Sequence, residues 1–186
     1  MVTLTQLWMP ILLAAVLVFV ASSLIHMVFK WHNPDYRKLG NEEEVRAALR
    51  ATGAAPGQYM IPYCIGAEGA KDPVIQKKWQ EGPIGFLMMR PAGMPSMGGT
   101  MAMWFAVTLL VALAAGYLAS RTVPVGASFL AVCRVVGGAT FLAYAFGGPI
   151  NAIWGGKPWV SAAKEVLDAA IYATVSACAF AWLWPR

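Results

Sequence analysis

The residues whose types could support chemistry are polar side chains that interrupt otherwise apolar segments. A charged group inside a lipid bilayer is costly, so each such residue is a hypothesis for a functional site. The candidate polar intramembrane site consists of Arg134, Asp168, Glu165, His26, Tyr172 and Ser22. Of these, Glu165, Asp168 and His26 can converge, together with the loop at residues 151–159, on one inward-facing polar pocket in the cytoplasmic half of the bundle.

Regular spacing supports this convergence on the last apolar segment. Polar residues recur there every three or four positions, which places them on one helix face. They are Ser161, Glu165, Asp168, Tyr172 and Ser176. On the first apolar segment, Ser22 and His26 are one helical turn apart. The two segments therefore each present a polar face to the bundle.

A structural interpretation of the same charges stays open. Arg134 and Asp168 can neutralise one another, while Lys164 and Glu165 extend toward the membrane interface. We expect the Arg134 guanidinium and the Asp168 carboxylate to face each other, because the helical rise puts them at nearly the same depth. An unpaired charge at that depth costs at least about 2.5–3.5 kcal/mol, and pairing removes much of this cost.

Sequence motifs assign no catalytic residue, no metal ligand and no cofactor. The chain has no GxSxG, Walker lysine loop, HExxH or GxGxxG pattern. Its three cysteines form no CxxC pair. The only histidine besides His26 is His32, which we place beyond Trp31 at the membrane surface. A haem between helices needs two axial ligands within the membrane, so we assign neither haem nor another metal.

Four apolar segments must position the polar residues. Of the 186 residues, 59% are hydrophobic and 12% are charged, which is more apolar than an average soluble domain. A membrane-spanning helix needs about 20 apolar residues. The segments that satisfy this are residues 7–29, 100–120, 125–147 and 160–184. Each is too long to be a strand of a membrane barrel.

The predicted fold class is an all-α membrane protein, a four-transmembrane-helix bundle with a small α+β cytoplasmic insertion between helices 1 and 2. Its parts are helix 1 in residues 1–29, the insertion in residues 30–99, and helices 2 to 4 in residues 100–186.

Local patterns predict the elements of the insertion. Asn41 and Glu44 have the spacing of a capping box and predict a helix of about three turns. Residues 72–81 are typical of a second helix. Residues 58–64 and 84–90 are short apolar runs bounded by glycine or proline, and we expect them to pair as strands. We expect this α+β unit to dock on the membrane face and to roof the polar pocket.

Small residues recur every four positions on three spans, which lets membrane helices approach closely. They are Thr108, Ala112, Gly116 and Ser120; Ala139, Ala143 and Gly147; and Ala169, Ala173, Ala177 and Ala181. Packing within the bundle is the main interpretation, with self-association or a protein partner as the alternative. The net charge of +5 does not point to nucleic acid, because in a membrane protein the distribution of lysine and arginine mainly reports orientation in the lipid bilayer.

Several short segments carry a resemblance to known proteins. They are SSLIHM at residues 22–27, HNPDYR at 32–37, GQYMIP at 57–62 and WLWP at 182–185. These segments are similar to a group of uncharacterised four-span bacterial inner-membrane proteins, over nearly the whole chain. The resemblance implies a bacterial membrane protein with four spans. It implies no activity, substrate or catalytic residue.

The missing catalytic motifs and the modest size favour a non-enzymatic membrane protein that binds a partner or acts as an accessory. One alternative is a small oligomeric transporter or channel with a polar pathway around Arg134 and Asp168. Another is a membrane enzyme acting on a lipid or quinone, in which Asp168 and His26 perform acid–base chemistry.

Basic residues predict how the chain is oriented in the bacterial inner membrane. Residues 30–99 hold nine lysines and arginines, whereas the opposite side has only Arg121 and Arg186. Lysine and arginine near the spans favour the cytoplasmic side. Both termini are therefore expected to be periplasmic and residues 30–99 cytoplasmic.

Cysteine labelling tests this orientation. In intact cells, a membrane-impermeant thiol reagent should modify a cysteine introduced near Arg186 and should leave Cys64 unmodified, because the membrane would shield the cytoplasmic side. Labelling of Cys64 without labelling near Arg186 would reverse the topology.

Overall fold

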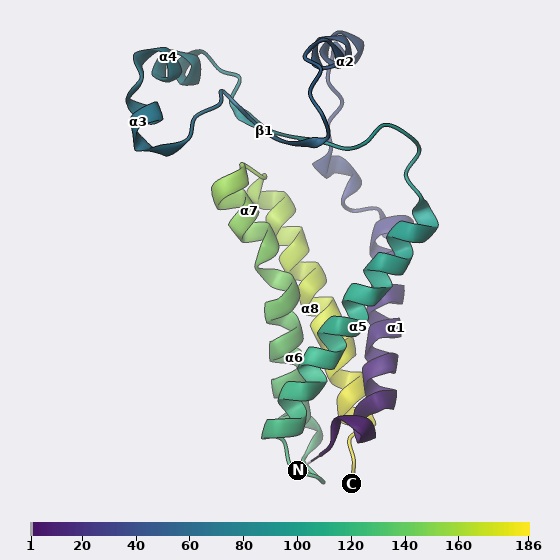
Figure 1. The fold of residues 1–186 in the computed structure, drawn as a ribbon. Coiled ribbons are helices and arrows are strands. Elements are labelled where there is room, and N and C mark those ends of the chain that lie inside the picture. The colour runs from purple at the N-terminus through teal and green to yellow at the C-terminus, as the bar shows by residue number, and fades with distance from the viewer. Residues whose placement is uncertain (1) are drawn as a thin grey trace. The chain divides into compact units, whose positions relative to one another are not determined.

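The computed structural model describes residues 2–186, and within them lie four helices long and apolar enough to cross a membrane. Their bounds are Leu4–Phe29, Met97–Thr122, Phe129–Gly155 and Trp159–Trp182. The helices run side by side, and both chain ends lie at the same end of the bundle (Figure 1). The four predicted spans are confirmed as helices of this length and composition.

Two of the spans change helix type or break along their length. The first comprises a short 3₁₀ turn, η1 (Leu4–Leu7), then α1 (Trp8–Ser23) and a π-helical end, η2 (Leu24–Phe29). The second is α5 (Met97–Thr122), the third is α6 (Phe129–Ala145) followed by α7 (Gly147–Gly155), and the fourth is α8 (Trp159–Trp182). The break between α6 and α7 precedes Pro149, which has no N–H to bond the carbonyl of Ala145.

Side-chain caps determine where two of these helices begin. The Ser96 hydroxyl accepts from the backbone N–H of Gly99 at 3.1 Å, and α5 starts at the residue after Ser96. Ser128 caps α6 in the same way. An N-cap serine satisfies one of the free N–H groups of the first turn. The third span therefore begins at Phe129, four residues later than the sequence predicted.

The C-terminal residues close the end of the bundle that carries both termini. The Trp184 indole N–H donates to the carbonyl of Pro124 at 2.9 Å. The backbone N–H of Gly126 donates to the carbonyl of Pro185, also at 2.9 Å. These bonds tie the end of α8 to the loop between α5 and α6.

Small residues pack the helices closely, as the four-residue spacing predicted for α5 and α8. Gly116 of α5 lies where a Cβ atom would come within 3.1 Å of Ile11 and 3.2 Å of Phe180. Gly137 of α6 faces the Cβ atom of Ala177 on α8. The stripe on the third span differs, because Ala139, Ala143 and Gly147 are not buried. Together with α5, Ala139 and Ala143 line an apolar surface groove.

A second compact unit comprises residues Tyr36–Met94 together with Ile153–Gly156. Its elements are α2 (Glu42–Ala51), β1 (Gly57–Ile61), α3 (Gly66–Lys71), α4 (Pro73–Glu81) and β2 (Gly85–Met89). The strands pair antiparallel, with Tyr59 opposite Leu87. The predicted strand pair and both predicted helices are confirmed, whereas α3 was not predicted. The docking of this unit on the membrane face stays a prediction.

Substituting Gly116 tests the close packing of α1, α5 and α8. Gly116→Leu should destabilise the protein by about 1–3 kcal/mol, because the added side chain must displace Ile11 and Phe180. The measurement is the thermal midpoint in detergent. Gly138→Leu is the matched control, since nothing lies within 4 Å of a Cβ atom there. Equal midpoints for the two variants would contradict the packing.

Candidate functional site

The candidate site is built where the first span ends. In a π-helix each N–H bonds the carbonyl five residues earlier, and Lys30 bonds Ile25 in this way at 2.9 Å. The carbonyl of Ser22 accepts a hydrogen bond from Nδ1 of His26 at 2.9 Å. A carbonyl can only accept, so Nδ1 carries the proton. In the neutral ring, Nε2 of His26 is then the atom with a free lone pair.

A left-handed residue turns the chain back toward this histidine. Lys30 has φ of +54°, and a 3₁₀ turn, η3 (Asn33–Asp35), follows. The turn stacks the ring of His32 on that of His26, with centroids 4.8 Å apart and planes within 8° of parallel. His32 lies beyond the end of the first span at Phe29, as the sequence predicted, but its side chain is only 13% exposed, which the sequence did not predict.

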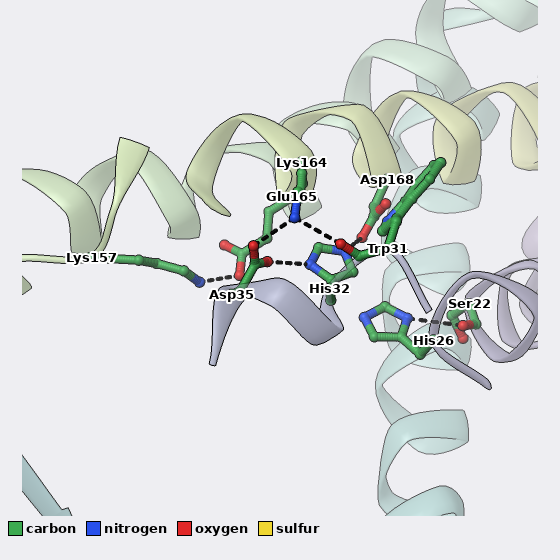
Figure 2. Close-up of polar contacts among 9 residues, drawn as sticks. All are labelled: Ser22, His26, Trp31, His32, Asp35, Lys157, Lys164, Glu165 and Asp168. Atoms are coloured by element: carbon green, nitrogen blue, oxygen red, sulfur yellow. Dashed lines mark hydrogen bonds and ion pairs between the residues drawn. The ribbon is translucent and has the colours of Figure 1, made fainter. Parts of the chain in front are cut away.

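The ring of His32 bridges two carboxylates (Figure 2). Its Nδ1 lies 2.9 Å from Asp35 Oδ2, and its Nε2 lies 2.8 Å from Asp168 Oδ2. Both carboxylates are largely buried, with side chains 12% and 6% exposed. Ionised carboxylates only accept, so with both acids ionised the His32 ring donates from both nitrogens. The unit is then a carboxylate–imidazolium–carboxylate chain.

Lysines complete the network around these acids. The Lys164 ammonium donates to Asp35 Oδ1 at 2.6 Å and to the carbonyl of Trp31 at 2.7 Å. Lys157 pairs with Glu165. Lys164 and Glu165 are thus ion-paired rather than merely extended toward the interface. The cluster holds three carboxylates, on Asp35, Glu165 and Asp168, against three cations, on His32, Lys157 and Lys164.

The network changes the acidity of Asp35, which lies outside the spans. The hydrogen bond from Lys164 lowers the pKa of the Asp35 carboxyl below its usual 3.8, and the bond from His32 acts in the same direction. Desolvation opposes this shift. The net lowering keeps Asp35 ionised, so it can hold the His32 ring in one orientation.

A cavity of about 660 Å³ lies between the four spans beside this network. It is lined by Ser22, Ser23, His26, Met27, Thr100, Met101, Trp104, Tyr144, Gly147, Gly148, Asn151, Lys157, Glu165, Asp168 and Tyr172. The rings of Trp104, Tyr144 and Tyr172 contact one another, with centroids 5.3 to 6.5 Å apart. Most of the wall is apolar, and its charged side chains Lys157, Glu165 and Asp168 come from α8 and the residues just before it.

Two buried polar atoms of cavity-lining residues have no hydrogen-bond partner among residues 2–186. They are the hydroxyl of Tyr144 and Oδ1 of Asp168. A buried polar group without a partner costs about 1–3 kcal/mol, and more if it is charged. Such groups in a native protein call for an explanation, and a bound molecule is one.

The predicted Arg134–Asp168 pair is wrong. In the described part of the chain, no side-chain hydrogen bond or ion pair involves Arg134, whose side chain is exposed. Because α6 begins at Phe129, Arg134 lies only about 7–8 Å along the helix axis from that end. It is level with Ala177, whose carbonyl accepts from the thiol of neighbouring Cys133. Ala177 lies about 13 Å beyond Asp168 along α8. Arg134, which is level with Ala177, is therefore too far from Asp168 to pair with it.

The remaining residues of the predicted site do come together. His26, Ser22, Glu165, Asp168 and Tyr172 all line the cavity, although their functional role stays a prediction. Sequence reasoning missed the partners from the turn after α1, above all His32 and Asp35. The histidine and the aspartate three residues later were a usable signal, because that spacing fits one turn of helix.

Comparison of the chain with protein-family models, with curated proteins and with solved structures gives no match. The resemblance to a family of bacterial inner-membrane proteins therefore stays a prediction. The fold and the site define the class only coarsely. Four apolar helices suggest a membrane-embedded protein, and these helices line an open cavity with a largely buried charge network on its wall.

The Asp35 interaction predicts a pH dependence of stability. Asp35→Asn should lower the thermal midpoint at neutral pH, because it removes the charge that Lys164 and His32 bind. A carboxyl with a lowered pKa stabilises the folded state above its ordinary value of 3.8 and loses that contribution as pH falls through the lowered pKa. The difference between wild type and variant should therefore shrink below about pH 4.

Thermal melts of the detergent-solubilised protein between about pH 6 and pH 3 provide the measurement. Glu68→Gln is the control, because Glu68 pairs with Lys71 in an exposed position where removing the pair should have little effect. A difference for Asp35→Asn that stays constant over this range would contradict the assigned role of the carboxylate.

Proposed function

We propose that the protein binds, without transforming it, a neutral amphipathic molecule in the cavity between its four spans. The single observation that carries this proposal is the cavity of about 660 Å³ whose lining residues include two with unpartnered buried atoms, Tyr144 and Asp168. A mostly apolar cavity of this size with a few convergent polar groups is typical of small-molecule sites. In this proposal, the partner that the protein binds in the cavity is a small molecule.

The lining supports an amphipathic ligand. Trp104, Tyr144 and Tyr172 form an aromatic wall, and Met27 and Met101 add flexible apolar surface. Aromatic and methionine side chains bury large apolar area against a ligand. A ligand that lies along this wall can place its polar end at the charged side of the cavity.

The charges support a ligand whose polar end is neutral and can donate a hydrogen bond. The carboxylates and cations of the cluster balance one another, so an additional ligand charge would remain uncompensated in a poorly solvated site. The Asp168 Oδ1 atom needs a donor, and the Tyr144 hydroxyl can donate or accept. Ligand hydroxyl groups can satisfy these two atoms.

The positions of Arg134 and Asp168 favour binding of a ligand over transport along a polar pathway around these two residues. That pathway required Arg134 and Asp168 to lie together, and the two are separated by about 13 Å along the helix direction. The acid–base alternative paired Asp168 with His26. The partner of Asp168 is instead His32, which is held between two carboxylates.

We further propose that the membrane is a bacterial inner membrane, with residues 30–99 in the cytoplasm. The basic residues of that segment support this orientation. The unburied small residues Ala139 and Ala143, in the apolar groove between α5 and α6, support self-association or a protein partner on that face.

Extraction of the purified protein tests the ligand proposal. Protein isolated from native membranes in a mild detergent is denatured in organic solvent, and the released molecules are measured by mass spectrometry. The wild type should release a neutral hydroxyl-bearing amphipathic molecule in about equimolar amount. Gly147→Phe should reduce it by at least about 10-fold, because Gly147 lines the cavity and nothing lies within 4 Å of a Cβ atom there, which leaves room for a ring that competes with the ligand.

The matched control is Gly138→Phe. Nothing lies within 4 Å of a Cβ atom at Gly138, and this residue does not line the cavity. This variant should retain the ligand. Release of bulk phospholipid alone, in equal amounts from all three proteins, would contradict the proposal.

A further inference from the structure

We infer that His26, His32 and Asp168 form a binding site for one divalent first-row transition metal ion on the wall of the cavity. One potential ligand atom from each of these residues lies within 4.8 Å of the other two. All three residues belong to the membrane bundle, and they come from η2, the turn after it and α8. This inference goes beyond the proposed ligand, shares with it the buried Asp168 carboxylate, and has a separate test.

Both histidines are oriented as metal ligands are. A histidine that binds metal through one nitrogen usually donates its other N–H to a carboxylate or a backbone carbonyl, which fixes the ring and its tautomer. His32 uses Nδ1 to bond Asp35, and His26 uses Nδ1 to bond the carbonyl of Ser22. The Nε2 atoms of both rings are thus the free or exchangeable ones (Figure 2).

Asp168 provides the independent sign of a ligand. Its side chain is only 6% exposed, yet Oδ1 has no hydrogen-bond partner among residues 2–186. Its Oδ2 atom bonds Nε2 of His32, so the carboxylate and the imidazole nitrogen already face each other at 2.8 Å. An ion bound by both replaces the proton that they share, and satisfies the carboxylate more fully than that single bond does.

The ligand atoms must rearrange only slightly to bind an ion. Metal–nitrogen and metal–oxygen bonds of about 2.0–2.2 Å place neighbouring ligand atoms roughly 3.0–3.5 Å apart. His32 and Asp168 must move apart by a few tenths of an ångström, and from a separation of up to 4.8 Å the His26 ring must approach by up to about 1.3–1.8 Å. His26 lines the cavity, so its side chain has space to move. The remaining coordination positions then face the cavity.

The ligand types select the class of ion. Imidazole nitrogen suits Zn²⁺, Fe²⁺, Co²⁺ and similar ions, whereas Mg²⁺ and Ca²⁺ prefer oxygen ligands alone. None of the three cysteines is in the cluster, so a thiolate-selective ion such as Cu⁺ is not expected. Two histidines and one carboxylate with open positions also fit a site that exchanges its other ligands.

Titration of the full-length protein with Co²⁺ tests the inference. The purified protein, in detergent and without an affinity tag containing histidine, should bind about one Co²⁺ per chain and develop visible absorption of coordinated cobalt. Zn²⁺ should displace the cobalt and abolish the absorption. The variants His26→Gln, His32→Gln and Asp168→Asn should each weaken binding by at least about 100-fold.

Two further variants separate binding from folding. Asp35→Asn acts through the His32 ring, so it should weaken binding by about 10- to 100-fold and shift the cobalt absorption while one ion still binds. Glu81→Gln, in the second compact unit, should bind like wild type. Thermal melts identify any ligand variant that fails to fold, and the His26→Gln titration then decides, because His26 bonds only a backbone carbonyl.

Absence of cobalt absorption in the folded wild type would overturn the inference. Unchanged affinity in folded His26→Gln and Asp168→Asn proteins would also overturn it. The extraction experiment fails or succeeds separately, because Gly147→Phe leaves all three proposed metal ligands in place and should still bind Co²⁺.

Discussion

The charge of Asp168 is the constraint on which the rest of the site depends. Its side chain is almost fully buried in α8, among helices that are otherwise apolar. A carboxylate in such surroundings must be paired or neutralised, and removing a partner from a buried pair costs about 3–5 kcal/mol. The His32 ring supplies that partner at 2.8 Å. The end of the first span is therefore held against the last span by an interaction that the fold cannot easily lose.

The turn after the first span follows from this requirement. His32 can reach Asp168 only if the chain turns back immediately after the first span ends at Phe29. Lys30, whose backbone is in the left-handed region, makes that turn. The ring then needs a second acceptor, which Asp35 provides, and Asp35 needs a second cation, which Lys164 provides. Each partner compensates a charge that the previous one introduced. Asp168, His32, Asp35 and Lys164 are consequently joined in one continuous chain of contacts, while Lys157 and Glu165 form a separate ion pair beside it.

The sequence predicted what depends on local pattern. Span length and composition predicted the four helices, and capping spacing and short apolar runs predicted α2 and the β1–β2 pair. The pairing of Asp168 was predicted wrongly, because it depends on where a helix begins. Placing the start of the third span at residue 125 put Arg134 too deep. Ser128 caps α6 instead, and the span continues past Phe146 into α7.

The contact between His32 and Asp168 spans 136 positions, and no periodicity within one segment predicts such a contact. The π-helical end of the first span adds to this difficulty. A regular α-helical count through Phe29 would have pointed the later residues in other directions, since a π-turn holds more residues. The polar stripe on α8 was recognisable because it lies on one regular helix. Its partners were not, because they follow an irregular segment.

The two proposals are linked through the charge of the cavity. Without a metal ion, the acids and bases of the cluster balance, so a neutral hydroxyl group is the favoured ligand. A divalent ion in place of the proton shared by His32 and Asp168 would add one net positive charge at the same wall. A ligand hydroxyl group coordinated to such an ion would lose its proton more readily, as metal-bound water does. If both proposals hold, occupancy by an ion would shift the favoured form of the ligand's hydroxyl group from neutral toward ionised.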